Sequence, residues 1–84
     1  MRYTGKLVTV DPLGRLLDGT PMHIGDPVEY LTVRGGRALG RIEGFTGGVG
    51  PVVRVTGKKS GAFGYYVGDT FEANLLWLSR RKVR

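Results

Sequence analysis

The sequence contains no cysteine and only one histidine, so the commonest ligands of structural metal sites are missing. Without cysteine there is also no disulfide framework to hold a small domain together. His23 lies in a loop rich in proline and glycine, where a surface or half-buried imidazole is more common than a general base. We therefore expect neither a metal site nor a cofactor.

Long hydrophobic runs are also missing. No apolar stretch approaches the ~20 residues that a membrane-spanning helix needs. The segment Met1–Val10 does not have the pattern of a secretory signal. We expect a cytoplasmic protein that contacts no membrane and takes no small-molecule substrate.

Helical periodicity is nearly absent. The longest segment without Gly or Pro runs from Asp69 to Arg84, and its Phe71, Leu75 and Leu78 would suit one short C-terminal helix. Elsewhere short apolar runs alternate with turn residues every 8–12 residues or so, which is roughly the spacing of β-sandwiches and β-barrels. Glycine is abundant instead, with 15 residues in 84, and its irregular placement indicates turns and close backbone approaches.

The expected strands are short and bounded by turns. They lie at Lys6–Val10, Arg15–Leu17, Pro27 to Leu31 or Val33, Ala38–Phe45 and Pro51–Thr56. The segment Tyr65–Glu72 is expected to carry one or two more strands around Gly68 and Asp69. The Arg34–Arg37 segment predicts a hairpin turn, because its paired glycines accept positive φ. Gly40 and Gly44 share one face of their strand, which indicates sharp curvature or a close neighbour. We expect one β domain over residues 1–78 and a basic tail over residues 79–84.

The charge balance is strongly basic, with 13 Lys and Arg against 7 Asp and Glu and a net charge of +6. Such a balance favours acidic partners, chiefly nucleic acid. The acidic residues fall mostly in predicted turns, where Asp caps its own backbone. No two of them are spaced for acid–base catalysis, so we expect no catalytic residue and no enzymatic activity.

Basic residues near turns and at the chain end are the candidate RNA contacts. They are Arg34, Arg37, Lys58, Lys59, Arg80 and Arg81. Tyr65 and Tyr66, next to a basic loop, are candidate base-stacking residues. A tyrosine pair of this kind more often has one ring in the core and one at the surface.

Seven short motifs follow one another in order along the chain. They are Gly5-Lys6-Leu7-Val8, Gly14-Arg15-Leu16-Leu17, Pro21 with Ile24-Gly25-Asp26-Pro27-Val28, Leu39-Gly40-Arg41-Ile42, the Gly47-Val49-Pro51 loop, Val53-Arg54-Val55 and Tyr66-Val67-Gly68-Asp69. Their order and spacing resemble the glycine–arginine-rich core protein of H/ACA ribonucleoproteins, in its compact archaeal form. The resemblance covers about residues 3–73.

The resemblance implies a small six-stranded β-barrel of the reductase/isomerase/elongation-factor type. It also implies a non-catalytic subunit of an RNA-guided pseudouridine synthase, which modifies rRNA. In that family the barrel binds the catalytic subunit without needing the guide RNA, and assists substrate RNA loading and product release. The implied partners are the catalytic subunit and, within the complex, the guide and substrate RNAs.

The resemblance places the protein-partner contact at an apolar loop and its neighbours. The residues are Ile42, Phe45, Gly47, Val49, Pro51 and Val52. The family loop usually reads Phe-Gly-Pro-Val followed by Pro-Tyr, and only Gly47, Val49 and Pro51 match that pattern. The basic residues leave a second function open, a stand-alone RNA-binding β-barrel such as a ribosomal protein.

Overall fold

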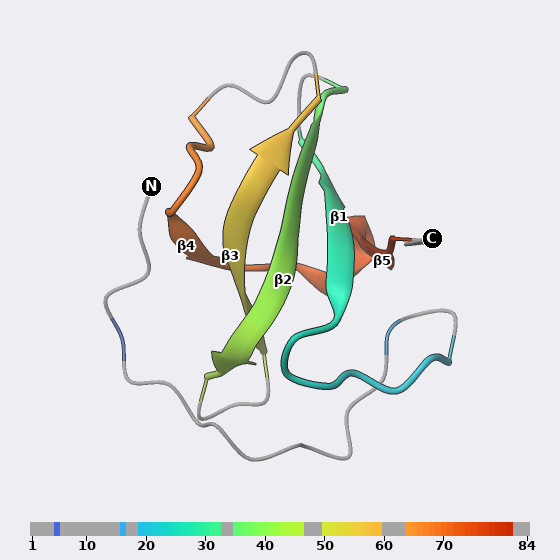
Figure 1. The fold of residues 1–84 in the computed structure, drawn as a ribbon. Coiled ribbons are helices and arrows are strands. Elements are labelled where there is room, and N and C mark those ends of the chain that lie inside the picture. Colours follow the sequence, from blue (N-terminus) through green and yellow to red (C-terminus); the bar gives the residue numbers. More distant parts are fainter. Residues whose placement is uncertain are drawn as a thin grey trace.

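The computed structural model describes residues 5, 16, 19–32, 35–46, 50–59 and 64–81 of the 84-residue chain. Over these residues the protein is an all-β domain built on one antiparallel sheet (Figure 1). The elements are β1 (Pro27–Leu31), β2 (Arg37–Phe45), β3 (Pro51–Lys58), β4 (Thr70–Glu72), the short 3₁₀ helix η1 (Leu75–Trp77) and β5 (Leu78–Arg80). Their order across the sheet is β4-β3-β2-β1-β5, and within this part of the chain the two edge strands do not pair to close a barrel.

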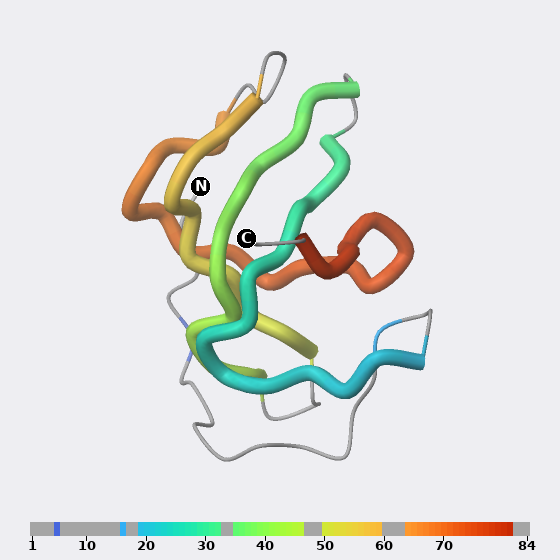
Figure 2. The backbone as a smooth tube through the Cα atoms, turned by 45° about the vertical axis from the view of Figure 1, so that its right-hand side comes forward, coloured from blue at the N-terminus to red at the C-terminus, as the bar shows by residue number. Residues whose placement is uncertain are grey.

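The two edge strands are consecutive in the sequence, although they lie at opposite sides of the sheet. Residues 73–77 join them by crossing behind β3 and β2, as Figures 1 and 2 show. A flat five-stranded sheet would separate its edges by ~19 Å. A crossing of two extended residues and one 3₁₀ turn spans only ~16 Å. The sheet must therefore curl, and its concave side encloses the core.

Two register shifts in the β2–β3 ladder increase this curl. One lies between Leu39 and Gly40, and the other between Ile42 and Gly44. Bulges of this kind bend the strand and strengthen its right-handed twist. At Gly40 the strands approach so closely that an added Cβ would lie 2.4 Å from the carbonyl oxygen of Arg54. The expected close neighbour of this glycine is confirmed.

The concave face carries one continuous hydrophobic core. Its buried members come from every strand, from the crossing and from the segments before β1; they are Leu16, Met22, Val28, Ile42, Phe45, Val53, Val55, Phe71, Ala73 and Leu78. Phe71 also packs edge-on against Tyr30 and Tyr65, with ring centroids 4.9 and 5.1 Å apart. This aromatic cluster holds the loop before β4 against β1.

The three central strands are confirmed close to their predicted bounds. The predicted hairpin between β1 and β2 is also confirmed, with Gly35 at a φ of 84° and the Thr32 amide donating to the Gly36 carbonyl at 2.8 Å. The predicted strands at 6–10 and 15–17 lie outside the described residues, apart from Leu16, which is buried.

Two predictions near the C-terminus need correction. Tyr65–Glu72 was expected to carry one or two strands around Gly68 and Asp69, but only its last three residues form a strand, β4, because Tyr66 to Asp69 make a turn closed by the Asp69 amide. The short helix exists as the single turn η1. Ser79 and Arg80 belong to β5, paired with Glu29 and Val28, so the sheet continues into the predicted tail.

Replacing Gly40 with Ala should lower the free energy of unfolding by about 1–3 kcal/mol, the usual cost of overpacking. The new methyl group would meet backbone of β3 that is held in the ladder and cannot withdraw. Gly57→Ala is the matched control, since its nearest neighbour would be Leu39 Cδ1 at 3.8 Å. Chemical denaturation of both variants measures the difference, and equal stabilities would contradict the close approach.

Candidate nucleic-acid interface

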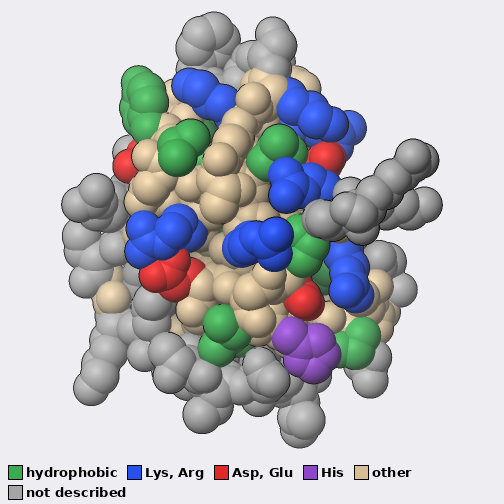
Figure 3. Space-filling model, viewed as in Figure 1, with side chains coloured by type: hydrophobic (Ala, Val, Ile, Leu, Met, Phe, Trp, Pro, Cys, Tyr) green, Lys and Arg blue, Asp and Glu red, His purple; other side chains and the backbone are tan. Residues whose placement is uncertain are grey.

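The convex face of the sheet carries a group of basic side chains, called the basic face below. Arg37, Arg41 and Arg54 point outward because they alternate with the buried residues of β2 and β3. Lys58 and Lys59 extend from the end of β3. In Figure 3 the Lys and Arg side chains spread across this side of the molecule, between a few acidic ones.

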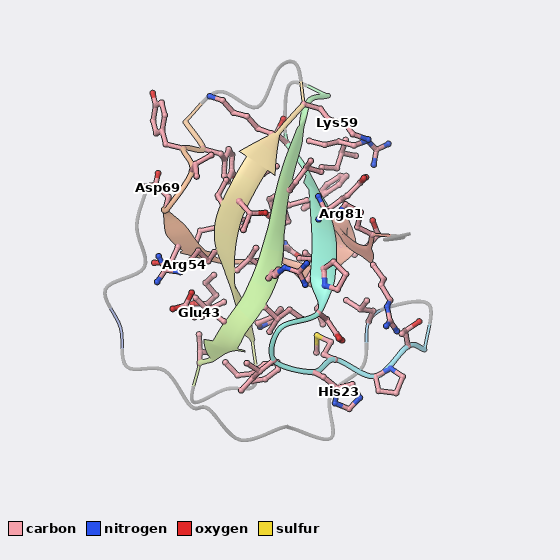
Figure 4. All side chains as sticks on the ribbon, in the orientation of Figure 1. His23, Glu43, Arg54, Lys59, Asp69 and Arg81 are labelled. Carbon is pink, nitrogen blue, oxygen red and sulfur yellow. The ribbon has the colours of Figure 1, made fainter. Side chains whose placement is uncertain are left out.

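Part of this positive charge is already neutralised. Arg54 binds the carboxylate of Glu43 through two nitrogens, with Nη2 donating to Oε1 at 2.7 Å, and Nη1 donates to the Gly68 carbonyl at 3.0 Å. Figure 4 shows Arg54 and Glu43 side by side next to β3. The hydrogen bonds and the charge of Arg54 hold the pKa of Glu43 below its ordinary value.

A second carboxylate serves two cations at once. Glu29 accepts from Arg37 Nη1 at 3.3 Å and from Lys59 Nζ at 3.4 Å. These distances are long for charge-assisted bonds, and the two cations are about half exposed or more. The pair of cations therefore keeps an excess positive charge that solvent or a ligand can reach.

Arg41 and Lys58 have no carboxylate partner among the described side chains. Arg41 Nη1 donates to the Gly25 carbonyl at 2.9 Å, which orients the guanidinium without neutralising it. Lys58 Nζ lies 4.9 Å from the centre of the exposed Tyr66 ring. Two carboxylates, Glu29 and Glu43, pair with three of the five cations of the basic face, and Arg41 and Lys58 remain as candidate phosphate contacts.

The two tyrosines at the edge of the basic face differ as expected. Tyr65 packs against the core through Tyr30 and Phe71, and burial raises the pKa of its phenol. Tyr66 is exposed. An exposed ring beside a lysine is a common stacking surface for a base, whereas Tyr65 forms the wall of a neighbouring pocket.

The structure brings only some of the predicted RNA contacts together. Arg37, Lys58 and Lys59 meet at one end of the basic face, where the Lys59 amide donates to the Arg37 carbonyl at 2.8 Å. Arg80 and Arg81 lie at the end of β5, where the Arg81 amide donates to the carbonyl of Pro27, the cross-strand partner of Arg41. Figure 4 shows Arg81 on the same side of the molecule as Lys59. Arg34 lies outside the described residues.

The expected apolar docking surface needs correction. Ile42, Phe45, Pro51 and Val52 are all buried, with Ile42 and Phe45 in the core and the Pro51 carbonyl bonded to the Ala73 amide. Pro51, Val52 and Val53 are buried in succession where the β2–β3 register shifts after Ile42, so the alternation of buried and exposed residues breaks at this end of the ladder. These four side chains are therefore unavailable to a partner, and Gly47 and Val49 lie outside the described residues.

Arg41 was missed as a site residue, although the alternation of Arg37, Leu39 and Arg41 places it on the basic face.

The expected turn-capping role of the acids is confirmed at Asp26 and Asp69, whose carboxylates accept from the backbone amides of His23 and Tyr66. Across the described ranges there is no cluster of three metal-binding side chains, and no helix is long and apolar enough to cross a membrane.

We compared the chain with known protein families, curated proteins and solved structures. No protein-family model, curated protein or solved structure is significantly similar to the chain.

Replacing Arg54 with Gln should raise the pKa of Glu43 toward its ordinary value. Because the pKa of Glu43 is lower in the folded than in the unfolded protein, its ionised carboxylate stabilises the fold at any pH above the unfolded-state pKa. That contribution is lost as the pH falls through the folded-state pKa. The stability of the native protein should therefore decline more on acidification than that of Arg54→Gln. NMR titration of the Glu43 carboxyl measures the shift. Lys58→Gln, with the same loss of charge, should leave that titration unchanged.

Proposed function

We propose that this chain is a non-catalytic, RNA-associated subunit of a ribonucleoprotein. The observation that carries the proposal is the excess of cations on the convex face, of which Arg41 and Lys58 have no carboxylate partner among the described residues. Phosphate contacts of this kind give affinity without sequence preference.

The motif series extends this proposal to a particular complex. It supports an accessory subunit of the H/ACA RNA-guided pseudouridine synthase, which binds the catalytic subunit and assists substrate loading and product release in rRNA modification. The finer fold in this proposal is a small six-stranded β-barrel. Its place of action would be the cytoplasm.

An exposed apolar contact for that partner lies beside the basic face. Val67 is the most exposed large apolar side chain described, at 69%, and it follows the exposed Tyr66. Both belong to the Tyr66–Asp69 motif of the resemblance. We place the protein contact here, since the side chains first expected to make it are buried.

A stand-alone RNA-binding domain is the second candidate, and the basic face supports it equally. The two candidates differ in what the isolated chain does. A stand-alone protein would bind RNA tightly by itself, whereas an accessory subunit would depend on its protein partner for most of its affinity.

The double variant Arg41→Gln/Lys58→Gln should weaken RNA binding for all sequences and lower the salt slope by about one unit for each lost phosphate contact. Fluorescence anisotropy at several salt concentrations measures both effects. The control is Glu43→Gln/Arg54→Gln, which removes one charge of each sign from the same face and should bind as the native chain does. Equal binding by all three proteins would contradict the role of the basic face.

A purified pseudouridine synthase catalytic subunit should form a complex with this chain that survives nuclease treatment. Val67→Asp should weaken that complex at least tenfold while leaving the exposed turn folded. Thr56→Asp, an exposed change on β3, is the matched control. Absence of a complex with the native chain, together with saturable RNA binding by the chain alone, would favour the stand-alone alternative.

A further inference from the structure

An aromatic pocket opens at the end of β1, on the concave side of the sheet. It has a volume of about 330 Å³ and is lined by Tyr30, Leu31, Thr32, Gly35, Tyr65 and Trp77. Three of these side chains are aromatic, and they come from three separate parts of the chain. Neither the proposed phosphate contacts nor the proposed protein contact uses this pocket.

The pocket has a preformed wall and one accessible ring. Tyr30 and Tyr65 pack against the core, with centroids 6.1 Å apart, and the Tyr30 hydroxyl accepts the Asn74 amide at 3.5 Å. Trp77 is half exposed although it lies directly before β5, which pairs with β1. The Trp77 amide donates to the Asn74 carbonyl within η1, at 3.0 Å. An indole whose backbone is fixed in this way, with much of its surface open, presents a flat stacking surface at little entropic cost.

The side of the pocket formed by Leu31 adjoins the basic face. Leu31 is the cross-strand partner of Arg37, and the Lys59 amide is bonded to the Arg37 carbonyl. Two cations that share a single carboxylate therefore stand beside a pocket in which three of the six lining residues are aromatic. A ligand with a flat ring and an attached phosphate matches both features.

We propose that this pocket binds one unpaired nucleobase of a single-stranded RNA, stacked on Trp77, while the adjoining phosphate meets Arg37 and Lys59. The inference rests on the proposed RNA association and adds the recognition of an unpaired base to it. Aromatic grooves also take proline-rich peptides. The cations beside the pocket favour the nucleic acid, because such a peptide brings no charge to balance them.

Trp77 is the single tryptophan of the chain, so its fluorescence reports on the pocket directly. We expect a single-stranded octauridylate to quench this fluorescence with saturation. An abasic oligomer of the same length has the same phosphates, and it should bind without quenching. Equal quenching by both oligomers, or quenching by a polyproline peptide but not by octauridylate, would overturn the proposal.

Substitutions separate the pocket from the basic face. Trp77→Ala should weaken binding of labelled octauridylate roughly tenfold, the usual effect of losing one base stack, and should leave the abasic oligomer unaffected. Leu76→Ala is the matched control, because Leu76 is 67% exposed and does not line the pocket. Circular dichroism verifies that both variants are folded.

The outcomes also separate this inference from the proposed function. If binding depends on Arg41 and Lys58 while Trp77→Ala binds octauridylate as the native chain does, the base pocket is refuted and the basic face stands. If neither oligomer binds with saturation, the base pocket is refuted, and the complex with the catalytic subunit then decides the proposed function. If Trp77→Ala loses octauridylate binding, Leu76→Ala retains it, and both variants still bind the abasic oligomer, the result supports both the base pocket and the basic face.

Discussion

The short crossing from β4 to β5 is the constraint on which the rest of the structure depends. Residues 73–77 must reach from one edge of a five-stranded sheet to the other, and they are too few to cross a flat one. The sheet curls as a result, and the curl creates both a concave side that holds the core and a convex side that spreads Arg37, Arg41 and Arg54. Core and basic face are two consequences of one short connection.

The same crossing assembles the aromatic pocket. It ends in η1, which places Trp77 next to β1, and its Asn74 amide is bonded to the Tyr30 hydroxyl. The Asn74 side chain also accepts the Leu76 amide at 3.0 Å and fixes the start of the turn. Tyr30 and Trp77, far apart in the sequence, therefore lie close together. Their positions are fixed because the crossing and β5 also contribute Ala73 and Leu78 to the core.

The sequence predicted the central hairpins well, because β1, β2 and β3 have regular alternation and are bounded by Gly or Pro. It did not predict β5, whose Leu78–Arg80 pairing depends on a distant strand rather than on local pattern. The apolar site was misplaced for a related reason. Strict alternation cannot reveal that Pro51, Val52 and Val53 are buried in succession where the register shifts beyond Ile42. The length of a strand can be inferred from local sequence, whereas the burial of its side chains depends on the packing of the whole sheet.

The shared carboxylate of Glu29 has a consequence for selectivity. An anion that arrives at Arg37 and Lys59 competes there with the Glu29 carboxylate. An isolated small anion gains little from that exchange, since it replaces one negative group by another. A polymer that reaches Arg41 and Lys58 at the same time gains contacts for which no described carboxylate competes. If the proposed RNA association holds, this arrangement would favour polyanions over monomeric phosphates.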